Sequence, residues 1–239
     1  MEQTRTTPYS GTRADLHEAL GRILAERWTC RQFLPDPVPR ATVGRLLELA
    51  QRTPSWCNTQ PWHVHITEGD ATRRLREGLL EHVRDGNPAV PDFPFPARYT
   101  GVYRQRRRDC GVQLYGSLGI AKGDQEGTLR QLLRNFELFD APHVAIVTTE
   151  ADLGVYGAVD CGLYIDTFLL AAHSLGLAAA PQAALASYAP FLRDHLGIPD
   201  HRRVVAGVSF GHPDTDHPVN SFRTARENPE NAVTWHTDA

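Results

Sequence analysis

Two arginines bracket a hydroxyl near the start of this 239-residue chain, in the segment RWTCRQF. Arg27, Thr29 and Arg31 occupy alternate positions, so their side chains converge on one side if the segment is extended. Planar guanidinium groups together with a hydroxyl donor suit a phosphate group. Because this spacing is common by chance, it indicates an anion site only where other parts of the chain support it.

The stretch TPSWCNTQPW, residues 53–62, concentrates rigid, aromatic and hydrogen-bonding side chains. It contains two prolines, two tryptophans, a serine, an asparagine and a glutamine. Such a turn could simply close the helix that precedes it. It could equally present a flat, polar-edged surface to a ligand, and the residues themselves leave both interpretations open.

The sequence contains no conventional catalytic motif. It has no G-x-S-x-G, H-E-x-x-H, Walker or G-x-G-x-x-G pattern, so no nucleophile or general base is indicated. The cysteines are far apart and no histidines stand at zinc spacing, and the pair His63 and His65 lacks a third ligand, so we expect no metal. Enzymes without such groups commonly take their chemistry from a cofactor.

The apolar spacing predicts the elements that position these residues. Helices are expected at 16–24, 43–50, 70–83, 103–118, 127–136, 159–175 and 188–195, and strands at 63–67, 142–148, 177–180 and 203–210. The helix at 159–175 is apolar nearly all round, which is typical of a central helix. Pro54 is expected to help end the second helix, and Ser187 to cap the last one.

Residues 85–97 carry too many prolines for regular structure. Because core-forming segments follow, we predict one domain over 1–239, with an excursion at about 85–127 and an extended tail at about 211–239. Whether the loop is an ordered lid or a disordered segment stays open. Four aromatic residues could line a pocket or pack within the loop: Phe93 and Phe95 in it, and Tyr99 and Tyr103 beyond it.

Composition excludes some classes of function. A formal net charge of -3 argues against nucleic-acid binding, and the basic run RQRRRD is best read as a solvated helix face. No apolar run approaches the length of a bilayer span, and the first residues are polar rather than signal-like. With 4 scattered cysteines expected as free thiols, we predict a cytoplasmic protein that binds no membrane.

The chain resembles the FMN-dependent nitroreductase family in three places. RWTCRQF is similar to the family's R-x-S-x-R/K segment, and TPSWCNTQPW is close to its A-P-S-x-x-N-x-Q-P-W. The third match runs from Asp160 through GLAAAPQAA to the terminal FRTAR. The variable middle of the chain is most similar to the longer branch of the family, which has a helical excursion.

This resemblance implies an α+β fold, with a mostly antiparallel central sheet surrounded by helices, built as an intertwined homodimer. FMN would lie at the dimer interface, its phosphate and ribityl chain held by Arg27, Thr29 and Arg31. Arg31 would also approach the pyrimidine edge, and Arg226, with or without Arg223, would complete the phosphate site.

The resemblance also assigns residues around the flavin ring. Pro54, Ser55 and Asn58 would reach the flavin from the opposite subunit, and the ring would be lined by Pro181, Gln182, Ala183 and Ala184. Many members have Glu-Gly where this chain has Ala183-Ala184, so any role of that glutamate is absent here. Trp28 and Trp56 replace smaller or basic residues and would narrow the pocket or add stacking surface.

The function implied is electron transfer from NADH or NADPH through FMN to a small electron-poor acceptor, such as a nitroaromatic or a quinone. The chemistry would occur at the flavin N5 by a ping-pong mechanism, with no catalytic side chain. One alternative is a specialised flavin-dependent oxidase or reductase acting on a biosynthetic intermediate. Another is a non-catalytic protein that binds flavin or, through the RQRRRD run, nucleic acid.

Overall fold

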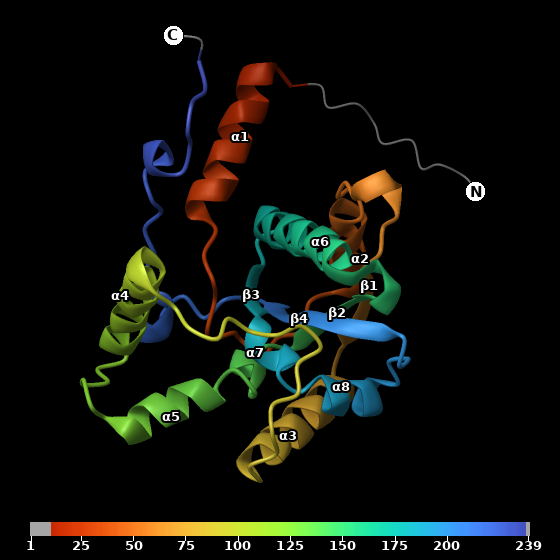
Figure 1. Ribbon diagram of the computed structural model, residues 1–239, viewed down its shortest axis with the longest axis vertical. Helices are drawn as coiled ribbons and strands as arrows, with labels where there is room; N and C mark the ends of the chain where they lie inside the picture. Colours follow the sequence, from red (N-terminus) through yellow and green to blue (C-terminus); the bar gives the residue numbers. More distant parts are fainter. Residues whose placement is uncertain (1–10, 238–239) are drawn as a thin grey trace.

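The computed structural model of the protein describes residues 11–237. Within them, four strands form one sheet in the order β1-β2-β4-β3 (Figure 1). The strands are β1 (His63–Thr67), β2 (His143–Glu150), β3 (Ala178–Gln182) and β4 (Arg202–Gly211). All three pairings are antiparallel, and a bulge interrupts the β2–β4 register between Val147 and Thr148.

Eight α-helices surround this sheet in the described part of the chain. They are α1 (Arg13–Glu26), α2 (Arg40–Ala50), α3 (Asp70–Arg84), α4 (Gly101–Ser117), α5 (Gln125–Leu133), α6 (Gly154–Ser174), α7 (Ala183–Ala186) and α8 (Ala189–Leu196). Helices and an antiparallel sheet together confirm the predicted α+β class.

Strand β2 shows why the sheet is covered on both faces. Its side chains alternate, because successive residues of a strand point to opposite sides. Ala145 and Val147 belong to a buried cluster with residues of α2 and α6, whereas Val144 and Ile146 belong to another with residues of α3 and α8. In Figure 1, α2 and α6 accordingly lie above the sheet, and α3 and α8 lie below it.

The element boundaries correct several predictions. Helix α2 ends at Ala50, with Gln51 as its C-cap, so Pro54 lies too far along to end it. Strand β3 continues through Pro181 and Gln182, which were expected to follow it. The short helix α7 was not predicted, and α8 has Tyr188 rather than Ser187 at its N-cap.

Two helices expose apolar stripes. Helix α1 begins with a capping box between Thr12 and Asp15, yet it contains no buried residue. Its exposed leucines recur every fourth residue and are Leu16, Leu20 and Leu24. The polar sequence of residues 1–12 predicts a loose arm before α1, and most of it, residues 1–10, lies outside the described residues.

Helix α6 is the central helix that its apolar sequence predicts, but only one of its sides is buried within the chain. It buries Tyr164 and Phe168 but exposes Val159 and Leu163. The segment Ala151–Ser174 is long and apolar enough to cross a membrane by length and composition alone, since an 18-residue window within it has a mean hydropathy of 1.3. Its packing against β2, β3 and α2 identifies it instead as a core helix with one bare face.

The proline-rich loop between α3 and α4 is anchored to the core. The carboxylate of Asp92 is 5% exposed and accepts hydrogen bonds from Arg193 Nη1 at 2.6 Å and from the Val204 backbone N at 2.7 Å. The Val90 backbone N also donates to the Ser187 carbonyl at 2.7 Å. The loop, yellow in Figure 1, therefore forms an ordered strap across α8 and β4.

Candidate functional site

The segment RWTCRQF, residues 27–33 and called the arginine segment below, lies against the edge of the sheet. Thr29 forms an isolated parallel bridge with Ala179 of β3, and the Cys30 backbone N donates to the Ala179 carbonyl at 3.3 Å. The backbone of Arg27 is already extended where α1 ends. This arrangement places the arginine segment next to the strand that leads into Pro181–Ala184. The first and third of the three stretches that resemble the family therefore meet within one chain.

Arg31 carries a charge that no neighbouring carboxylate neutralises. Its guanidinium donates to the Thr29 carbonyl at 3.3 Å and lies 5.4 Å from the centre of the Phe222 ring. No ion pair involving it occurs among residues 11–237. Burial lowers the pKa of Arg31, although not enough to discharge an arginine at neutral pH. The site therefore offers a fixed cation to an anionic or electron-rich ligand.

The C-terminal FRTAR segment packs against the arginine segment. The guanidinium of Arg223 lies 4.3 Å from the centre of the Trp28 ring and donates to the Asn220 carbonyl at 2.8 Å. Arg226 is exposed, and its side-chain hydrogen bonds are to Thr224 and the Ala225 carbonyl. Both arginines remain without acidic partners in the described residues, which suits a phosphate.

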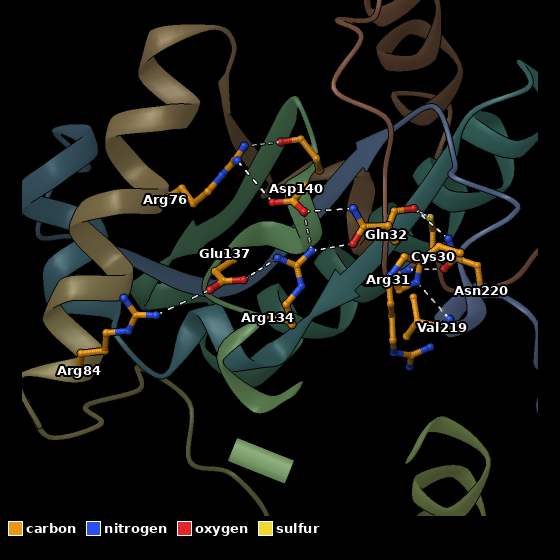
Figure 2. Close-up of polar contacts among 12 residues, drawn as sticks. Cys30, Arg31, Gln32, Arg76, Arg84, Arg134, Glu137, Asp140, Val219 and Asn220 are labelled. Carbon is orange, nitrogen blue, oxygen red and sulfur yellow. Dashed lines mark hydrogen bonds and ion pairs between the residues drawn. The ribbon is translucent and has the colours of Figure 1, made fainter. Parts of the chain in front are cut away.

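Sequence reasoning missed Asn220, which joins these two segments. Its side chain is buried, accepts from the Arg31 backbone N at 2.8 Å, and donates to the Gln32 carbonyl at 2.9 Å (Figure 2). It donates to the Asp214 carbonyl as well, at 2.7 Å. An asparagine in a Pro-Val-Asn turn gives little signal, because its partners lie 189 and 188 residues away.

A second polar network, also missed, supports Gln32 from the other side. Arg134 donates to Gln32 Oε1 and Asp140 Oδ2, both at 2.7 Å, and it also pairs with Glu137 (Figure 2). Burial raises the pKa of Asp140, but hydrogen bonds from Arg134 and Gln32 outweigh it and hold that pKa below its usual value. The network also fixes a strained turn, since Leu138, Phe139 and Asp140 all have positive φ.

A cavity of about 290 Å³ opens beside Arg31 and Arg134. Its polar lining comes from Arg31, Gln32, Arg130, Gln131, Arg134 and His217, and Leu118, Ile120, Gly127 and Val219 complete it. No carboxylate lines the cavity. Among the predicted site residues only Arg31 does so, and Arg31 therefore lies between the segment RWTCRQF and the open cavity.

The turn at 53–62 is rigid and faces outward. Three of its residues, Cys57, Asn58 and Gln60, have positive φ. The turn is held by Asp160, whose carboxylate accepts from the Trp56 backbone N at 3.2 Å, and by Ser55 Oγ, which accepts from the Gln60 backbone N at 2.9 Å.

Within one chain this turn lies far from the arginine segment. Trp56 contacts Tyr156 near the start of α6, with ring centres 5.0 Å apart. Arg27 and Trp28 share a small cavity with His173, at the end of α6. At a rise of about 1.5 Å per residue, the two contact points on α6 are about 25 Å apart. A single chain therefore does not bring the turn to the arginines.

The exit from β3 presents backbone rather than reactive side chains. Pro181 and Ala183 are exposed. Gln182 is buried, and its amide donates to the Asn135 carbonyl at 2.8 Å and accepts from Ser209 Oγ at 2.6 Å. The buried Gln182 side chain thus holds the end of the strand in place. A flat ring could rest on this surface of proline and alanine.

No group of three or more potential metal ligands occurs in residues 11–237. His63 and His65 lie side by side on β1, with ring centres 4.7 Å apart. The basic run on α4 is solvent-exposed, as predicted, and Arg106 pairs with Glu227 at 2.7 Å.

Comparison with known proteins identifies the class that this fold and site define. Residues 24–212 match the Nitroreductase family, and the chain belongs to that family. It is 36% identical over 222 residues to a 4-nitrobenzoate reductase of Nocardioides sp. (strain LMS-CY), covering 91% of this chain and 90% of the relative. It is 37% identical over 218 residues to the nitroreductase NfnB of Mycolicibacterium smegmatis, covering 91% and 92%.

One solved structure shares the fold of this chain over nearly its whole length. The crystal structure of the FMN-dependent nitroreductase NfnB from Mycobacterium smegmatis in complex with NADPH matches with a TM-score of 0.89. The identity is 35%, over 93% of this chain and 100% of that one. The family resemblance and the fold predicted from the sequence are thereby confirmed.

Proposed function

We propose that this chain is an FMN-dependent oxidoreductase that transfers electrons from NAD(P)H to a small electron-poor acceptor, such as a nitroaromatic or a quinone. The observation that carries the proposal is the meeting of the arginine segment, the FRTAR segment and the end of β3 around the unneutralised Arg31. Similarity to an FMN-dependent nitroreductase crystallised with NADPH supports it.

The residues present fit an anionic flavin nucleotide. The phosphate would meet three cations and a hydroxyl, from Arg27, Arg223, Arg226 and Thr29, and none of these arginines forms an ion pair within the described residues. Arg31 would hold the pyrimidine edge. The exposed surface at Pro181 and Ala183, with Gln182 and Ala184, supports the ring. These assignments are proposals that follow from position.

When bound, FMN supplies the redox chemistry, accepting a hydride at N5 and passing electrons on to the acceptor. The chain's own contribution is electrostatic and steric. Reduction places negative charge at the pyrimidine end of a flavin, and a fixed cation at Arg31 favours that charge because it needs no reorganisation. A flat, open face then lets donor and acceptor bind in turn, which is the basis of a ping-pong mechanism.

We further propose that the active form is a homodimer. Helices α1 and α6 each leave an apolar stripe without a partner in one chain, including Leu20 on α1 and Val159 on α6. Exposed apolar stripes on neighbouring residues of a helix are typical of surfaces that associate. A second copy would also bring its own turn to the flavin, so Pro54, Ser55, Trp56 and Asn58 would serve the partner's site.

The single-domain organisation and the cellular location follow as lesser proposals. The 85–127 excursion is held to α8 and β4 through Asp92, and the tail is held to the segment at Arg31 and Gln32 through Asn220. All 4 cysteines are free, which suits a reducing cytoplasm.

An absorption spectrum followed by anaerobic titration tests the main proposal. We expect the purified protein to be yellow, or to become so with added FMN, and NADH or NADPH to bleach the flavin. A nitroaromatic or quinone should then restore the colour. Colourless protein that does not take up FMN would contradict the proposal, and flavin that neither nicotinamide reduces would contradict the choice of donor.

A further inference from the structure

We propose that Asn220 is a positioning residue for flavin binding, which acts by fixing the backbone at Arg31 against the C-terminal arginine segment. This inference rests on the proposed function. Asn220 is not itself expected to contact the flavin, and it would act through Arg31.

Every polar atom of Asn220 has a partner. Its side-chain oxygen accepts from the Arg31 backbone N, and its amide nitrogen donates to the carbonyls of Gln32 and Asp214. Its backbone N donates to the His217 carbonyl at 2.9 Å, and its backbone carbonyl accepts from Arg223 Nη1 at 2.8 Å. The residue is 3% exposed, so water cannot replace these partners.

These bonds join two stretches that carry the proposed flavin arginines. The amide spans Arg31 and Gln32 on one side (Figure 2). Two residues further along, Phe222 lies beneath the Arg31 guanidinium, and Arg223 covers Trp28. Fixing the backbone at Asn220 therefore fixes the support for the Arg31 side chain as well.

Only an amide of this length satisfies the site. The position needs one acceptor and two donors on the same side chain. Aspartate keeps the acceptor but would set a carboxylate oxygen against the carbonyls of Gln32 and Asp214. Alanine would leave the Arg31 N–H and both carbonyls without partners, and the segment would have to shift to find others.

A double-mutant cycle on the full-length protein separates positioning from general stabilisation. The variants are N220A, R31A and the pair together, and the probe is FMN itself, titrated by fluorescence quenching. We expect N220A alone to weaken FMN binding about tenfold, because losing a buried hydrogen bond commonly changes an equilibrium constant by about that factor. With alanine already at position 31, the same substitution should change binding less than about twofold.

The flavin midpoint potential is a second readout that a purely structural role would not move. N220A should shift it to a more negative value while Arg31 is present, and leave it unchanged in the R31A background. The exposed Asn87, whose amide donates to the His82 carbonyl, provides the control, and N87A should change neither quantity.

Each outcome decides the inference. Wild-type FMN affinity in N220A, or an equal loss of affinity in both backgrounds, overturns it. If N220A does not fold, N220Q takes its place in the same cycle, because it keeps the amide but is one methylene too long to reach all three partners at their present positions. A wild-type protein that fails to bind FMN would instead refute the proposed function, and this inference with it.

Discussion

Arg31 is the residue at which the fold and the proposed chemistry meet. It borders a cavity without carboxylates, and its charge is free to act on a ligand. We predict that R31A weakens FMN binding about tenfold to a hundredfold, as expected for loss of a charged hydrogen bond. R31K should recover part of the loss, since it restores the charge but not the planar fork.

FMN titration of the two Arg31 variants checks this prediction. R130A is the matched control, because Arg130 lines the same cavity but pairs with Glu126 at the surface. An equal loss of FMN affinity in R130A would show that the cavity's overall charge matters, and not the position of Arg31.

His143 should make stability depend on pH. Its Nε2 accepts from the Val38 backbone N at 2.9 Å, which requires the neutral ring, and burial lowers the pKa of His143. The unfolded chain therefore binds a proton below about pH 6.5 before the native state does. The stabilisation is complete above that pH and is lost as pH falls toward the folded pKa, by at most about 1.4 kcal/mol per unit.

Urea unfolding between pH 7 and pH 5 tests the histidine. H143Q keeps an acceptor for Val38 and should flatten the pH dependence, whereas H63Q, on the exposed His63, should not. A wild-type slope that survives H143Q unchanged would assign the effect to another group.

At the residue scale the sequence predicted the recurring motifs but missed their supports. Arg27, Thr29 and Arg31 were recognised because their spacing is local. Asn220 and Arg134 were not, because the bonds that join them to Arg31 and Gln32 span more than 100 residues of the chain. A buried polar residue is identified by what surrounds it, and those surroundings come from distant parts of the chain that only folding brings together.

At the element scale, the strap between α3 and α4 depends on Asp92. This carboxylate is almost fully buried against Arg193, whose side chain is 14% exposed. We predict that D92A destabilises the protein by about 3 kcal/mol, because breaking a buried pair leaves an uncompensated charge. The strap itself should become sensitive to proteolysis.

Denaturant unfolding and limited proteolysis measure the two effects of D92A. The control is E48A, which breaks an exposed pair with Arg45 and should cost less than about 1 kcal/mol. A strap that resists protease in D92A would mean that the Val90–Ser187 hydrogen bond is enough to hold it.

The elements themselves were largely predictable, and the misses have physical reasons. Apolar periodicity located the main helices and all four strands because burial enforces it. Pro181 made β3 look shorter than it is, since proline has no N–H to donate. The strand continues because β3 is an edge strand, where one side of the backbone needs no sheet partner. α7 has four residues, too few to show a period.

For the whole molecule, the bare faces of α1 and α6 predict dimer formation. We expect V159E to yield monomers by light scattering and to lose FMN, because a charge would be buried in the interface and the partner's turn would be missing. L129E is the control, since Leu129 is similarly exposed on α5. A monomeric wild-type protein that retains flavin would contradict both the dimer and the shared site.

The turn at 53–62 and the arginine segment lie at opposite ends of α6. Variants in these two places should therefore be able to complement each other in a mixed dimer. If each site combines arginines from one chain with a turn from the other, R31A and N58A damage different halves of it. Co-expressed in equal amounts, the two inactive chains would pair at random, and each mixed dimer would contain one site with both halves intact. About a quarter of all sites would then regain function by complementation between subunits.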